Sequence, residues 1–156
     1  MKIIFLDFDG VLNSFSSSHD TNRSCTGLEA EAQELNPDLV RLLNKIIRIT
    51  GAKVVISSSW RYGKKKEELI KILEYRKFKG EIIGLTPDVF PSCRADEVQQ
   101  WLDDYKGEVE CFIILDDGHK ESFTKQFGDS FILMEKSDGL KKKHVKKAIQ
   151  ILGRLN

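Results

Sequence analysis

Short apolar runs recur along the chain, and each is rich in isoleucine, valine or phenylalanine. Runs of this length and composition are typical of β-strands that are covered on both faces. The segments between them carry apolar side chains three and four positions apart, which is the spacing of amphipathic helices. Strands are therefore predicted over residues 2–6, 53–56, 81–85, 110–115 and 130–134, and helices over residues 36–50, 64–77, 95–105, 120–127 and 140–155.

Strands alternate with helices five times in this prediction. Such alternation favours a parallel sheet with helices on both faces, joined by right-handed crossovers. We therefore expect a three-layer, Rossmann-like α/β fold with a central parallel sheet of about five strands. The length suits a single domain over residues 1–156. Ligands of such sheets bind beyond the carboxyl ends of the strands, so the residues that follow each strand are the candidates for chemistry.

The composition is that of a globular protein, with 40% apolar and 31% charged residues. The net charge of +1 argues neither for nor against a nucleic-acid partner, and the composition does not indicate an oligomeric state. No apolar run approaches the roughly 20 residues that cross a bilayer, and the apolar start is too short for a secretory signal, so a cytoplasmic location is expected. The three cysteines are widely spaced, which speaks against disulfides and against a zinc site.

Two pairs of carboxylates follow predicted strands. Asp7 and Asp9 follow the first strand and can face one pocket, because residues two apart in an extended segment point the same way. On its own, this pair is interpreted equally well as a solvated acidic turn. However, Asp116 and Asp117 follow the fourth strand, and carboxylates gathered at one sheet edge repel one another unless a cation is bound. Since Mg²⁺ prefers oxygen ligands, the two pairs together predict a magnesium site formed by Asp7, Asp9, Asp116 and Asp117.

Two further segments are suited to binding a phosphate group. Ser57 and Ser58 follow the second strand, where a hydroxyl and backbone N–H groups can hold phosphate oxygens. Ser57 is closest to the strand, whereas Ser58 can equally serve as a helix cap. Arg94 precedes the helix that comes after the third strand, and its guanidinium can neutralise a phosphate or a phosphorylated intermediate. Taken alone, Arg94 is interpreted more readily as a surface arginine.

In this order, these residues resemble the motifs of the haloacid dehalogenase (HAD) superfamily. The four motifs are similar to Asp7-Phe-Asp-Gly-Val-Leu12, Val54-Val-Ile-Ser57, Arg94 and Phe112-Ile-Ile-Leu-Asp-Asp117. More narrowly, Ser57-Ser-Ser-Trp-Arg61 and residues 94–102 resemble a capless branch of the superfamily, which includes phosphatase modules of RNA-repair proteins.

The resemblance implies a magnesium-dependent phosphatase that forms an aspartyl phosphate. Asp7 would be the nucleophile, and Asp9 would protonate the leaving oxygen and then activate water. Mg²⁺ would be held by Asp7, the backbone carbonyl of Asp9 and one or both of Asp116 and Asp117, with Asp117 favoured as the direct ligand. The phosphoryl oxygens would be held by Ser57, Ser58 and Arg94.

The gaps that hold a cap domain in many relatives are short here. Residues 14–35 are predicted to form a polar loop with a helical turn, and residues 86–93 a proline-containing loop. The first gap is residues 13–35, and the second, before Arg94, already holds a predicted helix and strand, so neither has room for a full cap and we expect an open site. Such a site suits a bulky substrate, such as the 5′ or 3′ end of a nucleic acid or a protein, or a small ester if the 14–35 loop or a neighbouring subunit covers it. Lysines 64–66 could bind a phosphate backbone, and the other candidate substrate contacts are Asn13, Trp60, Arg61 and His119.

Three other functions fit parts of the pattern. A small-molecule phosphatase such as a nucleotidase would use the same residues. A phospho-ligand binding module with little turnover is disfavoured by the presence of both Asp7 and Asp9. A metal-dependent nuclease would also need clustered carboxylates, but the Asp7-Phe-Asp-Gly-Val-Leu12 pattern disfavours it.

Overall fold

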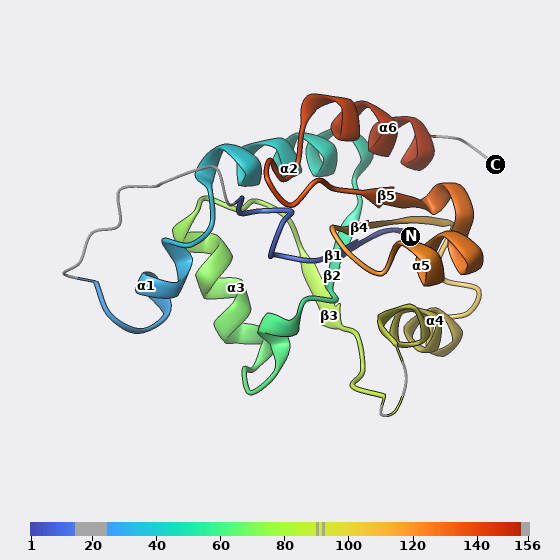
Figure 1. Ribbon diagram of the computed structural model, residues 1–156, viewed down its shortest axis with the longest axis horizontal. Coiled ribbons are helices and arrows are strands. Elements are labelled where there is room, and N and C mark those ends of the chain that lie inside the picture. Colours follow the sequence, from blue (N-terminus) through green and yellow to red (C-terminus); the bar gives the residue numbers. More distant parts are fainter. Residues whose placement is uncertain (15–24, 90, 92, 154–156) are drawn as a thin grey trace.

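The computed structural model describes residues 1–14, 25–89, 91 and 93–153, and its centre is a five-stranded parallel sheet (Figure 1). The order of the strands in the sheet is β3-β2-β1-β4-β5, and every neighbouring pair is parallel. The strands are β1 (Lys2–Leu6), β2 (Lys53–Ile56), β3 (Ile82–Leu85), β4 (Cys111–Asp116) and β5 (Phe131–Leu133). The predicted three-layer α/β fold is confirmed, and every strand boundary lies within one residue of the predicted one.

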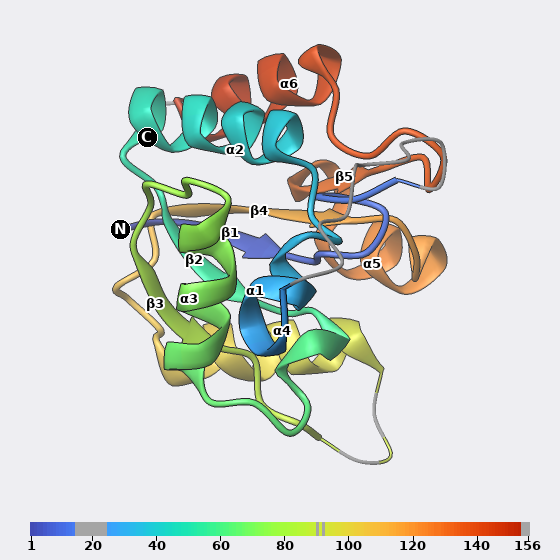
Figure 2. The ribbon, with the colours of Figure 1, turned by 90° about the vertical axis from the view of Figure 1, so that its left-hand side faces the viewer.

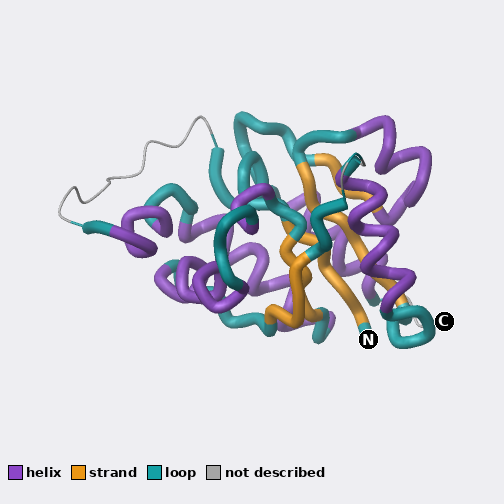
Figure 3. Tube along the Cα trace, turned by 90° about the horizontal axis from the view of Figure 1, so that it is seen from below, coloured by secondary structure: helices purple, strands orange, loops and turns teal. Residues whose placement is uncertain are grey.

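Helices cover both faces of the sheet (Figure 3). One face packs against α1 (Gly27–Ala32), α2 (Pro37–Thr50), α3 (Lys66–Tyr75) and α6 (Lys142–Leu152), and the other against α4 (Arg94–Asp104) and α5 (Lys120–Phe127). The side chains of β1 alternate between the two layers: Ile4 and Leu6 are buried in the larger apolar cluster, Ile3 and Phe5 in the smaller one. Burial on both faces explains why the strands are continuous apolar runs in the sequence.

Local signals in the sequence set the ends of α2, the longest helix described. The Asn36 side chain accepts a hydrogen bond from the Asp38 N–H at 2.8 Å, and Gly51 ends the helix with a φ of 68°. The helical turn predicted within residues 14–35 is α1, and residues 15–24 lie outside the described part. No cap domain is inserted in the described residues, and no helix among them has the length and apolar character to span a membrane.

The order of the strands creates a switch point beside β1. From β1 the chain builds β2 and β3 on one side, then crosses to β4 and β5 on the other. Backbone pairing continues one residue past the strand ends: the Asp7 N–H bonds to the Leu115 carbonyl, and the Ser57 N–H bonds to the Leu6 carbonyl, both at 3.0 Å. The residues that follow β1, β2 and β4 therefore lie side by side at the edge where such sheets bind ligands.

Candidate active site

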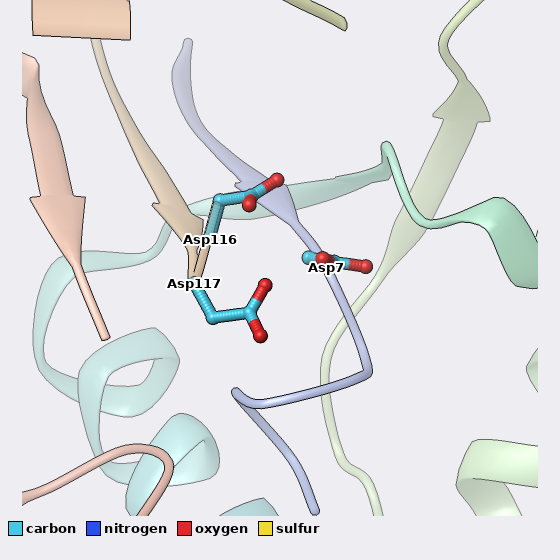
Figure 4. A group of neighbouring side chains, drawn as sticks. All are labelled: Asp7, Asp116 and Asp117. Carbon is cyan, nitrogen blue, oxygen red and sulfur yellow. The ribbon is translucent and has the colours of Figure 1, made fainter. Parts of the chain in front are cut away.

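Three carboxylates meet at the switch point (Figure 4). Asp7 follows β1, Asp116 ends β4 and Asp117 follows it, and these side chains bring one carboxylate oxygen each within 4.8 Å of one another. Asp7 and Asp116 are buried, while Asp117 is half-buried. The structure thus brings together three of the four residues predicted as metal ligands; we call them the carboxylate group.

Gly10 makes room for this group. Its φ is +70°, a backbone conformation that other residues rarely adopt. A Cβ atom at this position would lie 2.2 Å from Asp117 Oδ2, well inside the contact distance of the two atoms. The glycine after Asp9 is therefore required both by the turn and by the position of the Asp117 carboxylate.

Arg94 bridges two members of the carboxylate group. It is the first residue of α4, and its Nη1 lies 2.8 Å from Asp7 Oδ2 and 2.9 Å from Asp116 Oδ2. Only 14% of its side chain is exposed, so the surface interpretation of Arg94 is wrong. Burial by itself lowers the pKa of Arg94, but the charges of Asp7 and Asp116 outweigh it and hold that pKa above its usual value. Arg94 is a fixed cation directed into the site.

Asp9 lies apart from the carboxylate group and is exposed. Its Oδ1 accepts a hydrogen bond from Asn13 Nδ2 and its Oδ2 one from Trp60 Nε1, both at 2.9 Å. Asn13 Oδ1 also accepts from the Gly10 N–H at 2.8 Å, which ties the turn together. The Trp60 ring packs edge-on against Phe8, with 5.3 Å between the ring centroids. Trp60 and Asn13, predicted as substrate contacts, therefore orient the Asp9 carboxylate, a role that the sequence pattern did not indicate.

The hydroxyl of Ser57 is buried and has no hydrogen-bond partner among the described residues. Among the described residues, Ser57 Oγ and Thr86 Oγ1 are the two buried side-chain N or O atoms without a hydrogen-bond partner. A buried polar group without a partner is costly, and such groups in native proteins commonly await a ligand or water. Thr86 follows β3 as Ser57 follows β2. The sequence prediction did not include Thr86, although its position directly after an apolar strand could have indicated it.

A comparison with known protein families identifies the family of this chain. Residues 3–145 match the family described as the HAD domain in Swiss Army Knife RNA repair proteins. The chain belongs to this family. The resemblance to the HAD superfamily, and to its RNA-repair branch, is thereby confirmed. No curated protein and no solved structure matches the chain. Membership of the HAD family indicates a hydrolase of the phosphatase type.

The electrostatics of this HAD domain fit a bound cation. Burial, and then the charge of Asp7, raise the pKa of Asp116 to about 6, and the same two causes raise the pKa of Asp117. The ionised carboxylates thus repel one another. Arg94 and the exposed Lys136, whose Nζ lies 4.0 Å from Asp117 Oδ2, supply two positive charges against three negative ones. Every atom of the carboxylate group that could bind a metal is an oxygen, which is the ligand type that Mg²⁺ prefers. The group therefore suits Mg²⁺, the cation that HAD proteins generally use.

Stabilisation of the protein by Mg²⁺ is expected to fall as the pH drops through about 6. The raised pKa means that the folded protein binds a proton at Asp116 more tightly than the unfolded chain does. Below roughly pH 4, the ordinary pKa of aspartate, this proton makes its full contribution to the stability of the metal-free fold. The contribution is lost as the pH rises through about 6, the pKa of Asp116 in the folded protein. A proton on Asp116 also removes negative charge from the carboxylate group, which weakens the binding of Mg²⁺ there. The rise in thermal midpoint on adding Mg²⁺ should be large at pH 7.5 and small at pH 5.

The control for this pH dependence is Asp116→Asn, which cannot bind the proton or donate a charge to the metal. Its metal-free thermal midpoint at pH 7.5 should equal or exceed that of the wild type, because it relieves the repulsion within the carboxylate group. Because this variant has one negative charge fewer in the carboxylate group, its Mg²⁺ shift at pH 7.5 should be smaller than that of the wild type and should change less between pH 7.5 and pH 5. A wild-type Mg²⁺ shift of equal size at pH 5 and pH 7.5 would contradict the proposed effect of the proton.

Two predicted contacts take other roles in the HAD domain. Ser58 is buried, and its Oγ accepts from the Trp60 N–H at 3.3 Å at the start of a 3₁₀ turn, Ser59–Arg61, which matches the helix-cap alternative. His119 is exposed and lies against Phe123, with 6.0 Å between the ring centroids. Within the described residues His119 makes no hydrogen bond or ion pair with the carboxylate group. The neighbouring Gly118 does contact the group, because its N–H bonds to Asp116 Oδ1 at 2.8 Å.

Arg61, predicted as a possible substrate contact, has internal partners in the structure. Arg61 is buried, and its Nη2 forms an ion pair with Glu97 Oε2 on α4 at 2.6 Å. Its guanidinium also donates to the backbone carbonyls of Ser57, Ser58 and Thr86 at 2.9–3.1 Å. The 3₁₀ turn directs the Arg61 side chain into the protein interior. In the sequence, Arg61 could not be distinguished from the cations that follow it. Lys64, from the same run, pairs with Glu31 at 2.9 Å.

Proposed function

We propose that this HAD domain is a Mg²⁺-dependent phosphatase that removes a terminal phosphate from a nucleic acid through an aspartyl phosphate on Asp7. The observation that carries the proposal is the bridge from Arg94 to both Asp7 and Asp116, which sets a cation beside the nucleophile and the metal ligands. An arginine so placed can bind the phosphoryl oxygens and neutralise the charge of the transition state.

Two displacements on phosphorus make up the reaction. A carboxylate oxygen of Asp7 attacks the phosphorus, the bond from phosphorus to the leaving oxygen breaks, and Asp9 gives that oxygen its proton. The Asp9 carboxylate then takes a proton from water, whose oxygen attacks the same phosphorus and releases inorganic phosphate from Asp7. The hydrogen bonds from Asn13 and Trp60 keep the Asp9 carboxylate oriented for both transfers.

The phosphoryl group itself would be held by Arg94 and by the hydroxyl of Ser57, which is buried and without an internal partner. Mg²⁺, when bound to the carboxylate group, would neutralise phosphoryl charge and help orient the phosphate. Asp117 is favoured as a direct ligand, since both Asp116 oxygens already accept hydrogen bonds, one from Gly118 and one from Arg94. Any metal ligation by Asp9 would use its backbone carbonyl, because its carboxylate lies apart from the group.

A hollow beside Asp9 suits the leaving group. It has a volume of about 280 Å³, and its lining is mainly polar, with Ser59, Tyr62 and Lys64 beside Asp9. Glu31 and Glu34 also line it, so a further phosphate is not favoured there. A ribose or base is the better occupant, because these groups are uncharged and can form hydrogen bonds with the polar lining. With no cap domain in the described residues, the remainder of a long strand can continue out of the hollow. The family, named for RNA repair, supports the same substrate class.

The proposal is tested with a panel of phosphate esters in the presence and absence of Mg²⁺. The panel contains oligonucleotides phosphorylated at the 5′ or the 3′ end, mononucleotides, sugar phosphates and phosphopeptides, and the measurement is release of inorganic phosphate. We expect Mg²⁺-dependent release, with an end-phosphorylated RNA giving the highest kcat/KM. A higher kcat/KM with mononucleotides would favour a function as a nucleotidase. Cleavage within an oligonucleotide would favour a function as a nuclease. Tight phosphate binding without turnover would favour the binding module.

A further inference from the structure

A groove with a mainly basic lining lies beside α2. The elements that border it, α2, α3 and the loop from α3 to β3, can be followed in Figure 2. The volume of the groove is about 810 Å³, the largest among the hollows described. One wall is the exposed side of α2, and the other is the end of α3 with the loop that leads to β3. Asn44 joins the walls, because its Nδ2 donates to the Lys77 carbonyl at 2.8 Å and its Oδ1 accepts from the Lys79 N–H at 2.9 Å.

The groove is far more positive than the chain as a whole. Its lining has a single carboxylate, Asp38, in a protein whose net charge is only +1. The cations that line it are Arg41, Lys45, Arg48, Arg76, Lys77 and Lys79. Arg41 pairs with Asp38 at 3.1 Å, whereas none of the other five forms an ion pair within the described ranges. Like charges held together in this way repel, which favours a polyanionic partner.

The cations on α2 follow one another along its exposed side. Arg41, Lys45 and Arg48 are four and three positions apart, so each lies about one turn, ~5 Å, from the next. Such a row can face successive phosphates of one nucleic-acid strand. Between the walls, the half-buried side chains of Leu42 and Ile47 offer apolar surface to the sugar and base.

The groove and the hollow beside Asp9 are lined in part by neighbouring stretches of the chain. Glu31 and Glu34 line the hollow, and Pro37 and Asp38, a few residues further along the chain, line the groove. Arg76 lines the groove, and its Nε donates to the carbonyl of Ala32, the residue after Glu31, at 2.6 Å. The Asn36 N–H also bonds to the Leu12 carbonyl at 2.8 Å, which fixes the start of α2 to the loop that holds Asp9.

From these observations we infer that the basic groove binds the sugar-phosphate backbone of a single RNA strand whose phosphorylated end lies in the active site. The inference rests on the proposed function for the position of that end, but the groove's own binding does not require turnover. The groove has no aromatic side chain in its lining, so it offers no platform for stacked bases. Binding there therefore relies on the cations, with apolar contact from Leu42 and Ile47, and should tolerate sequence changes and depend strongly on salt.

The test reverses one charge on each wall, with Lys45→Glu and Lys79→Glu in one variant. Both side chains are exposed, and neither contacts the carboxylate group. The matched control is Lys106→Glu with Lys125→Glu, two exposed lysines on the α4 and α5 side of the sheet. Binding of a fluorescent 12-nucleotide RNA with hydroxyl groups at both ends is measured by anisotropy, in an Asp7→Asn background so that no turnover interferes. Thermal midpoints confirm that each variant is folded.

We expect the groove variant to bind this RNA at least about tenfold more weakly than its parent at low salt, and the control to lose much less. The salt slope of the logarithm of the binding constant should fall by roughly 1.4, for two lost phosphate contacts. In the otherwise wild-type protein, the groove variant should keep its kcat/KM on a small aryl phosphate.

Affinity unchanged within twofold, or an equal loss in the control variant, would overturn the groove inference. So would binding of duplex RNA that is tighter than binding of the single strand. Absence of turnover on every ester would instead contradict the proposed function, and the anisotropy measurement would still test the groove. The two failures are therefore distinguishable.

Discussion

Replacement of Asp7 by asparagine is expected to abolish phosphate release, with a loss in kcat of roughly 10⁴-fold or more, the scale seen when a covalent nucleophile is removed. The amide cannot attack phosphorus as the carboxylate does. The fold should persist, because the amide oxygen of the new side chain can still accept the Phe8 N–H bond and Arg94 keeps its contact with Asp116. Phosphate release from an end-phosphorylated RNA and from an aryl phosphate measures the effect.

A direct test of the covalent step is binding of beryllium fluoride, which mimics an aspartyl phosphate. With Mg²⁺ present, it should raise the thermal midpoint of the wild type and leave Asp7→Asn unchanged. Asp9→Asn is the matched control: its carboxylate lies outside the carboxylate group, so this variant should bind beryllium fluoride yet turn over slowly. Phosphate release that survives Asp7→Asn would rule out the covalent mechanism.

Arg61→Met is expected to destabilise the fold by about 3–5 kcal/mol, because it leaves Glu97 charged, buried and without its partner. Total stabilities are of order 5–15 kcal/mol, so this is a large share. For a chain of this size the loss corresponds to a fall in thermal midpoint of roughly 10 °C. Urea unfolding and differential scanning calorimetry would measure it.

The same substitution should impair catalysis at any temperature at which the protein is folded. Arg61 holds the carbonyls of Ser57 and Ser58, and its partner Glu97 lies three residues after Arg94 on α4. The pair therefore connects the two elements that present Ser57 and Arg94 to the phosphate. We expect a rise in KM for phosphate esters as well as a lower kcat.

The double variant Arg61→Met with Glu97→Leu separates these effects. Removing both charges should recover part of the lost stability, since no buried charge remains unpaired. Catalysis should remain impaired, because the carbonyls of the Ser57 loop still lack their donor. A double variant less stable than Arg61→Met alone would show that the ion pair is not the source of the destabilisation.

The strands and the carboxylate group could be predicted from the sequence for one physical reason. Strands covered on both faces must be apolar throughout, so the polar residues that end them, such as Asp7, Ser57 and Asp116, are conspicuous. Parallel strands then bring those ends to one edge, and residues far apart in the sequence become neighbours. Arg94 was placed mainly by its order among the motifs, and the structure supplies its two contacts.

The remaining features depend on tertiary packing, which composition does not encode. Arg61 looks like its exposed neighbours in the sequence, and only the 3₁₀ turn makes it a buried ion-pair partner. Trp60 orients Asp9 through a bond that spans fifty-one positions of the chain. The basic groove likewise combines α2 with residues 76–79, and neither segment alone carries a cluster of charge that exceeds an ordinary solvated helix face.

The indole bond from Trp60 to Asp9 also gives the protein an internal optical probe. The chain has two tryptophans, and the other, Trp101, is buried and stacked on Tyr105 on the opposite face of the sheet. Trp60 is half-buried, and its N–H points at the carboxylate proposed to transfer protons. Its emission should therefore respond when Asp9 changes charge or a phosphate ester enters, while Trp101 gives a constant background. Ligand entry and proton transfer could then be followed in stopped-flow experiments on the unlabelled protein.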